Sequence, residues 1–292
     1  MAPLIVITGP TASGKSSLAI KLAKKWGGEI VCADSRTVYK GMDIGTAKPS
    51  IDEQKQVPHH LLDIAMPGQR FTVHDFQTRA KNTIAKIRQR GNVPILVGGS
   101  GLYIDSVVLD YDLAVEGNLE QRHQLEAKSI DQLHTMLKNQ RIPLPENHLN
   151  KRYLIRALEK KTHISSGRTE PKDTTYVVAI ATEEATLQAR IRARVESMFE
   201  AGVVDEADRL AHQYGWDCQA MTGNIYAIIR QLYASDINRQ EAIERAIRRD
   251  RQLVKRQLTW LRRRTYVKWL SLEQAEQYFE HILEGYRDSN SY

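Results

Sequence analysis

Blocks of apolar and polar residues along the chain predict an α/β protein. Four short apolar runs, "PLIVITG", "EIVCAD", "HHLLDI" and "PILVGG", occupy residues 3–9, 29–34, 59–64 and 94–99. Their length suits buried strands, and the segments behind the first and third runs have helical periodicity. Strands that alternate with helices indicate a parallel sheet covered by helices on both faces.

Two segments between these strands predict helices. The first, "KSSLAIKLAKKWGG" (15–28), ends in two glycines, and the second, "FTVHDFQTRAKNTIAKIRQRG" (71–91), stops at Gly91. In the second helix Thr72 and Asp75 have the spacing of a capping box, with Asp in place of the usual Glu. The apolar stripe that this helix would turn to the sheet comprises Phe76, Ala80, Ile84 and Ile87.

The strand pattern stops near residue 112 and resumes with "TYVVAIAT" at 175–182. The polar stretch between them is compatible with helices, and the chain after Glu183 is mostly helical until a possible last strand at 266–272. We therefore expect three parts: a first part of the core (1–111), a helical insert (112–172), and the completion of the core with basic C-terminal helices (173–292).

Composition places the chain among soluble globular proteins. Its 292 residues are 41% apolar and 26% charged, and no apolar run approaches the length of about 20 residues that spans a bilayer. The N-terminus lacks the features of a signal peptide, and two isolated cysteines, Cys32 and Cys218, suit a reducing compartment. We expect a cytoplasmic monomer without a membrane contact.

The net charge of +7 is concentrated in one segment. Residues 238–264 hold ten Lys and Arg against three Asp and Glu, so the remainder of the chain is about neutral. Such a distribution favours a polyanionic partner such as nucleic acid. The alternative is a solvated helix that merely carries surplus arginine.

The strongest chemical signal is "GPTASGKS", which lies between the first strand and the first helix. Glycines let successive backbone N–H groups turn toward an anion, and the helix adds its positive end. Lys15 supplies a full charge, and the Ser16 hydroxyl is suited to ligating Mg²⁺. ATP or GTP is the usual occupant of such a loop. The predicted phosphate cradle comprises Gly9, Pro10, Thr11, Ala12, Ser13, Gly14, Lys15 and Ser16.

The carboxylates near strand ends are Asp34, at the end of the second strand, and Asp63, inside the third. Small-molecule kinases can place an Asp after the second strand, where it accepts the proton of a substrate hydroxyl. Asp34 would then lie at the carboxyl edge of the sheet, where ligands bind. The alternative is that Asp34 only caps the turn into "SRTVY". A GTPase is disfavoured because the "NKRY" at 150–153 lacks the Asp of a base-reading motif.

Three further groups are weaker candidates. In "GGSGLY" (98–103), Ser100 could donate to a phosphate oxygen from a loop that lets backbone approach a ligand. Arg190 and Arg194 lie one helical turn apart and could close over a diphosphate, although surface pairing is the commoner meaning of this spacing. Arg152 and Arg156 repeat the spacing within the insert.

Together these stretches resemble one family. "GPTASGKS", "DSRTVYKGMDIGTAKP" (34–49), "VPHHLLDI" (57–64), "VGGSGLY" (97–103), "RALE" (156–159) and "KRQLTWLR" (255–262) follow in the order seen in tRNA dimethylallyltransferases, also called tRNA isopentenyltransferases. The match extends from about residue 4 to about residue 270. "MDIGTAKP" and "KRQLTW" are far more specific to this family than the phosphate loop.

The resemblance implies a P-loop NTPase-like core and a particular reaction. A dimethylallyl group passes from dimethylallyl diphosphate to N6 of the adenine 3′ of the anticodon in tRNA, diphosphate leaves, and Mg²⁺ is required. It implies catalytic roles for Asp34, Ser100 and Arg194, with the loop holding the leaving group and Ser16 the metal. The residues implied in tRNA binding, at the anticodon stem-loop, are Asp34, Ser35, Arg36, Thr37, Ser100, Arg152, Arg156, Lys255 and Arg256.

Four positions depart from the family's usual pattern. Thr37 stands where Gln is usual after "DSR", Ser100 replaces a Thr, Tyr153 replaces an Arg, and Ile225 replaces the Gly before Tyr226. None removes a group that the chemistry needs. Three of the four fall on expected tRNA contacts, so the departures bear on tRNA choice more than on the reaction.

Three rival functions share some of these features. A dimethylallyltransferase acting on free AMP, ADP or ATP has the loop and the Asp, but a mononucleotide needs no basic segment of +7. A P-loop small-molecule kinase would consume ATP and need no RNA. A degenerate tRNA-binding module would keep the basic surface and lose the chemistry, against which the intact Lys15, Ser16, Asp34 and Arg194 argue.

Overall fold

The computed structural model describes residues 1–113, 119–159, 168–172, 174–223 and 225–289. The chain divides into two compact units, and each is described by itself. The first comprises Met1–Leu109 with Glu170–Tyr292, and the second is Asp110–Thr169, where the sequence predicted an insert over 112–172. Of that predicted insert, residues 114–118, 160–167 and 173 lie outside the described residues.

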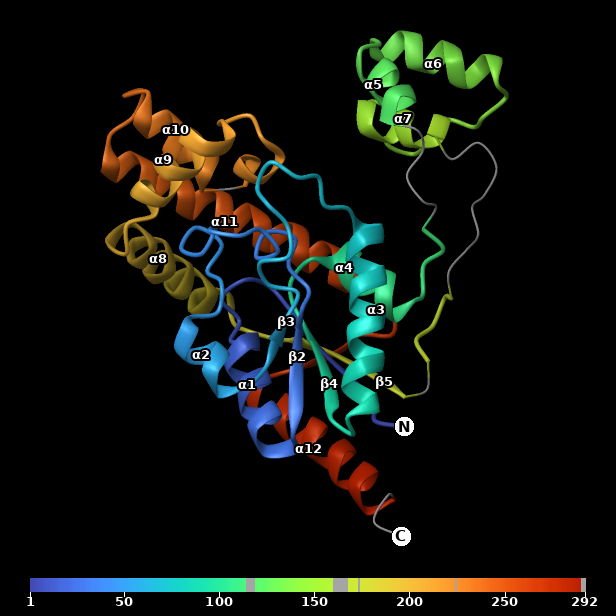
Figure 1. Ribbon diagram of the computed structural model, residues 1–292, viewed down its shortest axis with the longest axis vertical. Helices are drawn as coiled ribbons and strands as arrows, with labels where there is room; N and C mark the ends of the chain where they lie inside the picture. The colour runs from blue at the N-terminus through green and yellow to red at the C-terminus, as the bar shows by residue number, and fades with distance from the viewer. Residues whose placement is uncertain (114–118, 160–167, 173, 224, 290–292) are drawn as a thin grey trace. The chain divides into compact units, whose positions relative to one another are not determined.

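A six-stranded parallel sheet forms the centre of the first unit (Figure 1). Its order is β3-β2-β4-β1-β5-β6, and every neighbouring pair is parallel. The predicted α/β class is therefore confirmed, and the possible last strand at 266–272 is present as β6. The strands are β1 (Leu4–Thr8), β2 (Gly28–Cys32), β3 (His59–His60), β4 (Val93–Val97), β5 (Thr175–Ile180) and β6 (Lys268–Leu270).

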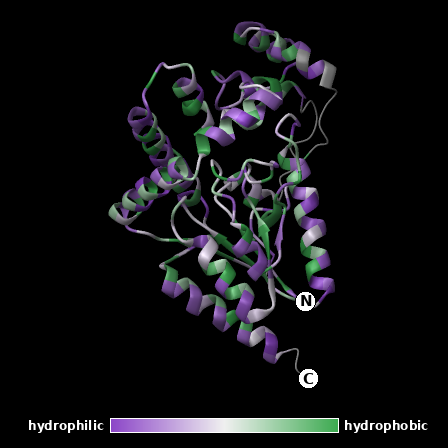
Figure 2. Cartoon of the chain, turned by 60° about the vertical axis from the view of Figure 1, so that its left-hand side comes forward, coloured by the Kyte–Doolittle hydropathy of each residue, from purple (hydrophilic) through white to green (hydrophobic). Residues whose placement is uncertain are grey.

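Helices cover both faces of this sheet because its strands are apolar on both sides. Ile5 and Ile7 of β1 belong to the core under α1 (Lys15–Trp26) and α12 (Leu272–Asp288), while Val6 between them is equally buried. On the other face, α3 (Val73–Gln89) packs against β4 and against α4 (Gly101–Val108). Figure 2 shows hydrophobic bands alternating with hydrophilic ones along these covering helices, as amphipathic helices require.

The predicted features of α3 are confirmed. Thr72 accepts a hydrogen bond from the backbone N–H of Asp75, and the Asp75 side chain accepts from that of Thr72. The four residues of the apolar stripe are all buried. Gly91, in the left-handed region at φ 79°, follows Arg90, the C-cap residue of the helix.

The position expected for Asp63 was wrong. The third strand is only His59–His60, so Asp63 lies in the loop beyond it rather than inside a strand. Its backbone is left-handed at φ 54°, and its carboxylate pairs with Lys48 Nζ at 2.6 Å. The apolar run predicts a longer strand because Leu61 is buried. Leu61 nevertheless lies beyond the last residue of β3 that pairs with β2, so its burial comes from packing of the loop.

The C-terminal part of the first unit is helical, as the sequence predicted. It contains α8 (Glu184–Glu200), α9 (Val203–Tyr214), the 3₁₀ turn η1 (Gln219–Thr222), α10 (Tyr226–Tyr233) and α11 (Arg239–Arg262). The basic segment is thus one long helix, and it packs against α8 and α10. No helix in the described ranges is both long and apolar enough to cross a membrane.

The second unit has a small core of its own. Its helices are α5 (Leu119–Glu126), α6 (Ile130–Asn139) and α7 (Lys151–Glu159), and Ser129 begins α6 with a capping box to Gln132. Arg122 donates to both oxygens of Glu159 at 3.0 and 2.9 Å, which joins α5 to α7. The buried residues of this core are Leu125, Leu133, Leu137, Leu154, Ile155 and Leu158.

A buried carboxylate joins three elements at the amino edge of the sheet. Glu29 of β2 accepts from Arg90 at 3.0 and 2.7 Å and from Asn92 at 2.8 Å, and His60 Nε2 lies 2.6 Å away. Burial alone would raise the pKa of Glu29, but these partners outweigh it and lower the pKa to about 2. The ionised form is therefore the one that stabilises the fold.

We expect Glu29→Gln to be destabilising near neutral pH and almost neutral near pH 2. The folded pKa lies below the unfolded value of 4.5, so the contribution of Glu29 is complete above that pH and lost as pH falls toward 2. The wild-type advantage in free energy of unfolding should shrink by about 3 kcal/mol across this window. Denaturant titrations of both proteins at several pH values measure it, and a pH-independent difference would contradict the assignment.

Candidate functional site

The phosphate loop connects β1 to α1 at the carboxyl edge of the sheet. Gly9 and Gly14 have φ of 140° and 92°, and Ala12 between them is also left-handed at 63°, so the loop curls over the start of α1. Lys15 Nζ donates to the carbonyl oxygen of Pro10 at 2.6 Å and lies 3.4 Å from Ser13 Oγ. The predicted cradle is therefore folded as such a loop.

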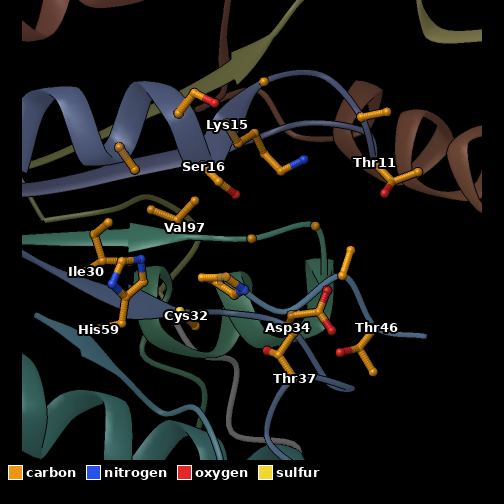
Figure 3. A pocket seen from close by; sticks show the side chains of 18 of the residues that line it. Thr11, Lys15, Ser16, Ile30, Cys32, Asp34, Thr37, Thr46, His59 and Val97 are labelled. Carbon is orange, nitrogen blue, oxygen red and sulfur yellow. The ribbon is translucent and has the colours of Figure 1, made fainter. Parts of the chain in front are cut away.

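A cavity of about 250 Å³ opens beside this loop. In Figure 3, Lys15 and Ser16 reach into it from one side, and Asp34, Thr37 and Thr46 line the opposite side. Toward its other end, Figure 3 shows Ile30, Cys32, Val97 and His59, which are mostly apolar. One cavity thus joins a cationic, hydroxyl-rich end to an apolar end, which suits a ligand that has a charged head and a hydrocarbon part.

Asp34 both lines the cavity and holds a turn. Its Oδ1 accepts the backbone N–H of Arg36 at 2.8 Å, and the N–H of Ser35, the residue between them, donates to Ser100 Oγ at 3.0 Å. The two readings of Asp34 from sequence are therefore compatible, because one carboxyl oxygen caps the turn. Ser100 joins the loop after β4 to the loop after β2, and its own O–H is not used in that bond.

The surroundings of Lys15, the cation at the centre of the site, disfavour its charged form. Burial is the main cause that lowers the pKa of Lys15, to about 8, and the charge of Arg194 adds to the effect while Asp34 opposes it. A lysine that is costly to keep charged gains most when an anion is bound beside it. A lowered lysine pKa in the free protein is what we expect of a side chain whose charge would be stabilised by a bound phosphate.

Two of the three arginines of "RIRAR", Arg190 and Arg194, reach the phosphate loop from α8. Arg190 Nη1 approaches the carbonyl oxygen of Ala12 at 3.4 Å, and Arg194 Nη1 donates to Thr11 Oγ1 at 2.5 Å. Arg194 also pairs with Asp250 of α11 at 3.4 Å. The sequence prediction that this pair could close over a diphosphate therefore agrees with where they lie, although their role stays a prediction.

Sequence reasoning missed Gln257. Its Oε1 accepts the backbone N–H of Thr11 at 2.9 Å, and its Nε2 donates to the carbonyl oxygen of Gly99 at 3.1 Å. Gln257 thereby ties α11 to two loops of the site at once. A signal was present: Asp250 and Gln257 are seven residues apart and hence on one face of a helix whose other face is basic.

The glycines of "GGSGLY" serve packing within the protein. A Cβ on Gly99 would collide with the Gln257 side chain, and one on Gly101 would collide with the Trp260 ring. Trp260 in turn donates to Asp105 at 3.1 Å. The close approach that the sequence suggested is therefore made by α11, which explains why "KRQLTW" and "GGSG" occur together in this chain.

The residues predicted to bind tRNA differ in their exposure and in their contacts within the protein. Arg36 donates to the carbonyl oxygens of Gln219 and Ala220 at 3.1 and 3.3 Å, so it braces η1. Thr37 is 5% exposed, and its hydroxyl finds no hydrogen-bond partner within the described residues. Thr37 can thus meet only a group that enters the cavity. Lys255 and Arg256, by contrast, are exposed on α11.

Arg152 and Arg156 belong to the second unit. They are exposed on α7, one turn apart, opposite the face that carries Leu154, Ile155 and Leu158. Tyr153 lies on the same outer side and is 44% exposed. The outer side of α7 therefore combines two cations with one aromatic ring.

The donor chemistry of the site fits Mg²⁺. Among the described residues, no group of three His, Cys, Asp or Glu side chains could hold a metal ion by itself. Ser16, exposed at the first turn of α1, offers one hydroxyl oxygen to the cavity. Mg²⁺ commonly takes few protein oxygens and completes its shell with substrate phosphates and water.

A loop of phosphate-cradle geometry at the carboxyl edge of a parallel sheet, with a carboxylate across the cavity, defines the class of P-loop-like α/β proteins. The family model "IPP transferase" matches residues 37–264. A tRNA dimethylallyltransferase of Anoxybacillus flavithermus is 40% identical over 281 residues, which cover 92% of this chain and 90% of that protein. The chain therefore belongs to the IPP transferase family, and it is a transferase.

Solved structures agree. A tRNA isopentenylpyrophosphate transferase of Bacillus halodurans has a TM-score of 0.75 and 33% identity, with 100% of both chains covered. A eukaryotic dimethylallyltransferase acting on tRNA has a TM-score of 0.79 and 25% identity, covering 93% of this chain and 74% of that one. The likeness to a full-length relative extends along the whole chain.

Proposed function

We propose that this protein transfers a dimethylallyl group from dimethylallyl diphosphate to N6 of the adenine 3′ of the anticodon in tRNA, releasing diphosphate. It acts as a cytoplasmic monomer. The observation that carries the proposal is the single cavity with two unlike ends. Its phosphate cradle suits the diphosphate, and its apolar end, with Ile30 and Val97, suits the five-carbon chain.

The phosphate loop in this reaction holds a leaving group. The N6 nitrogen forms a bond to C1 of the dimethylallyl group as the bond from C1 to the diphosphate oxygen breaks, and no phosphoryl group moves. Lys15, the loop N–H groups and Arg194 stabilise the charge that develops on the departing diphosphate. Ser16 would hold Mg²⁺, which would supply further positive charge to the departing diphosphate.

Asp34 acts on the acceptor. An adenine amino nitrogen is a poor nucleophile because its lone pair is delocalised into the ring. Asp34 orients the amine with a hydrogen bond and takes the proton that N6 loses on alkylation. Oδ1 is already used by Arg36, so Oδ2 is the oxygen that accepts this proton.

The tRNA is bound through its anticodon stem-loop by the exposed cations of α11 and α7. The target adenine leaves its stack to enter the cavity, where Thr37 lies. RNA of this kind is recognised largely by shape, stacking and phosphate contacts. The relatives named as tRNA dimethylallyltransferases support this choice of acceptor.

One assay separates the proposal from its rivals. The protein is incubated with Mg²⁺, labelled dimethylallyl diphosphate, and either unmodified tRNA or AMP. Label in tRNA supports the proposal, whereas label in AMP but not in tRNA identifies a mononucleotide enzyme. ATP turnover with a small acceptor identifies a kinase, and tight tRNA binding without transfer identifies a degenerate module.

The charge on α11 predicts a salt-dependent affinity for tRNA. Not every cation of this segment is available, because Arg239 donates to Phe199, Arg245 to Gln231 and Glu241, and Arg264 to Asp105. Arg256 and Arg263 are exposed and seven residues apart, hence on one face. Replacing both by Ala should reduce the slope of log affinity against log salt by about two.

The matched control is Arg79→Ala with Lys86→Ala, which are exposed and seven residues apart on α3. That pair should leave the salt slope unchanged. Filter-binding titrations of tRNA between low and moderate salt measure both slopes. An unaltered slope in the α11 variant would exclude this face of α11 from the interface.

A further inference from the structure

The motif "MDIGTAKP" (residues 42–49) contributes no reacting group to the proposed transfer, yet it forms a wall of the site. Thr46, Ala47 and Pro49 line the cavity beside the phosphate loop. The segment is irregular, and Ala47 is left-handed at φ 50°. A loop of this kind keeps its position only if other elements fix its backbone.

Glu206 fixes it. This glutamate of α9 is 2% exposed, and its Oε2 accepts the backbone N–H groups of Asp43 and Ile44, both at 2.8 Å. Its Oε1 accepts the N–H of Gly45 at 2.9 Å and the hydroxyl of Tyr226 at 2.7 Å. A carboxylate offers about four acceptor positions, and all of them are used here.

The contact is close enough to dictate the residue at 45. A Cβ on Gly45 would lie 2.6 Å from Tyr226 Cζ and 2.9 Å from Ile225 Cγ2, so only glycine lets the loop approach α10. At the other end of the loop, Lys48 pairs with Asp43 at 2.5 Å and Asp63 at 2.6 Å. The three N–H groups in the middle depend on Glu206.

We propose that Glu206 is a positioning residue that sets the wall formed by residues 42–49 around the bound donor. The donor's identity rests on the proposed function, but the positioning does not. Glu206 touches no reacting atom, and it acts through Thr46 and Ala47. The consequence is a selective one: a displaced wall loosens the binding of dimethylallyl diphosphate, while the cations of α11 and α7 that bind tRNA stay in place.

Glu206→Gln is the direct test. The amide keeps one oxygen, so its NH₂ group must face either the N–H groups of Asp43 and Ile44 or that of Gly45. We expect the KM for dimethylallyl diphosphate to rise on the order of tenfold, with the KM for tRNA within about twofold of wild type. A merely structural defect would lower kcat and leave both KM values unchanged.

Two further variants serve as a control and as an independent test of the same loop. Asp208→Asn, also on α9 but partly exposed, should leave every kinetic constant unchanged. Gly45→Ala pushes the loop away from α10 while Glu206 is intact, so it should raise the same KM. A wild-type KM for the donor in both Glu206→Gln and Gly45→Ala would overturn the proposal.

Hydrogen exchange tests the positioning without any activity. The amides of residues 43–45 should be protected in the wild type and exchange at least tenfold faster in Glu206→Gln, with the amides of α3 unchanged. If the Gln variant does not fold, Tyr226→Phe removes one of the four hydrogen bonds and should give a smaller effect in the same direction. Unchanged exchange at 43–45 would overturn the proposal, and a wild type that transfers no prenyl group would overturn only the proposed function.

Discussion

Asp34→Asn is expected to lower kcat for prenyl transfer by about 10²–10⁴-fold, the usual range for loss of a general base. The substitution can remove the proposed base without removing the hydrogen bond that holds the turn. Oδ1 of Asp34 accepts the N–H of Arg36 at 2.8 Å, and an Asn can keep that bond with its amide oxygen. What it loses is the second carboxylate oxygen, which in our proposal takes the proton from N6. Single-turnover assays with labelled dimethylallyl diphosphate and tRNA measure the loss.

The comparison with Asp34→Ala separates the two roles of this residue. Alanine removes both the base and the cap of the turn at Arg36, so it should also weaken tRNA and donor binding. Asparagine should leave both dissociation constants within about twofold of wild type. If Asp34→Asn retains more than a tenth of the wild-type kcat, Asp34 is a turn residue and another group accepts the proton.

Much of the fold could be predicted from local pattern because its signals are local. The capping box at Thr72, the buried stripe of α3 and the run at 4–8 each depend on neighbours in sequence. The third strand was predicted too long for the same reason. The pattern of apolar residues predicts that Leu61 is buried, but it cannot predict that the pairing of β3 with β2 ends at His60.

The candidate site could be predicted only in part, because some of its residues follow strand ends and others come from helices far away in sequence. Lys15, Ser16 and Asp34 follow strand ends, where the topology of a parallel sheet gathers side chains. Gln257 and Glu206 contact the site from helices 246 and about 160 residues away in sequence. Their roles depend on tertiary packing. The shared helix face of Asp250 and Gln257 can be seen in the sequence, but it does not say which loops Gln257 contacts, and a Glu on an amphipathic helix carries no local signal.

Lys15→Ala should be the most damaging change on the donor side, with a loss in kcat/KM for dimethylallyl diphosphate of about 10²–10³-fold. The lysine is held over the loop by the carbonyl oxygen of Pro10, and its surroundings lower its pKa to about 8. An ammonium that is poorly stabilised in the free protein gains most from a diphosphate, and gains more as negative charge builds on the departing oxygen. The loss should therefore fall on kcat as well as on KM.

Lys21→Ala on the same helix is the matched control, because Lys21 is 65% exposed and pairs with Glu276 at 2.6 Å. It should leave both constants unchanged. Affinity for tRNA should be within about twofold of wild type in either variant, since Lys15 faces the cavity. Inhibition by diphosphate gives the decisive reading: if Lys15→Ala binds diphosphate as the wild type does, the cradle does not hold the leaving group. If instead diphosphate affinity and kcat fall together, the charge of Lys15 acts on the bond that breaks.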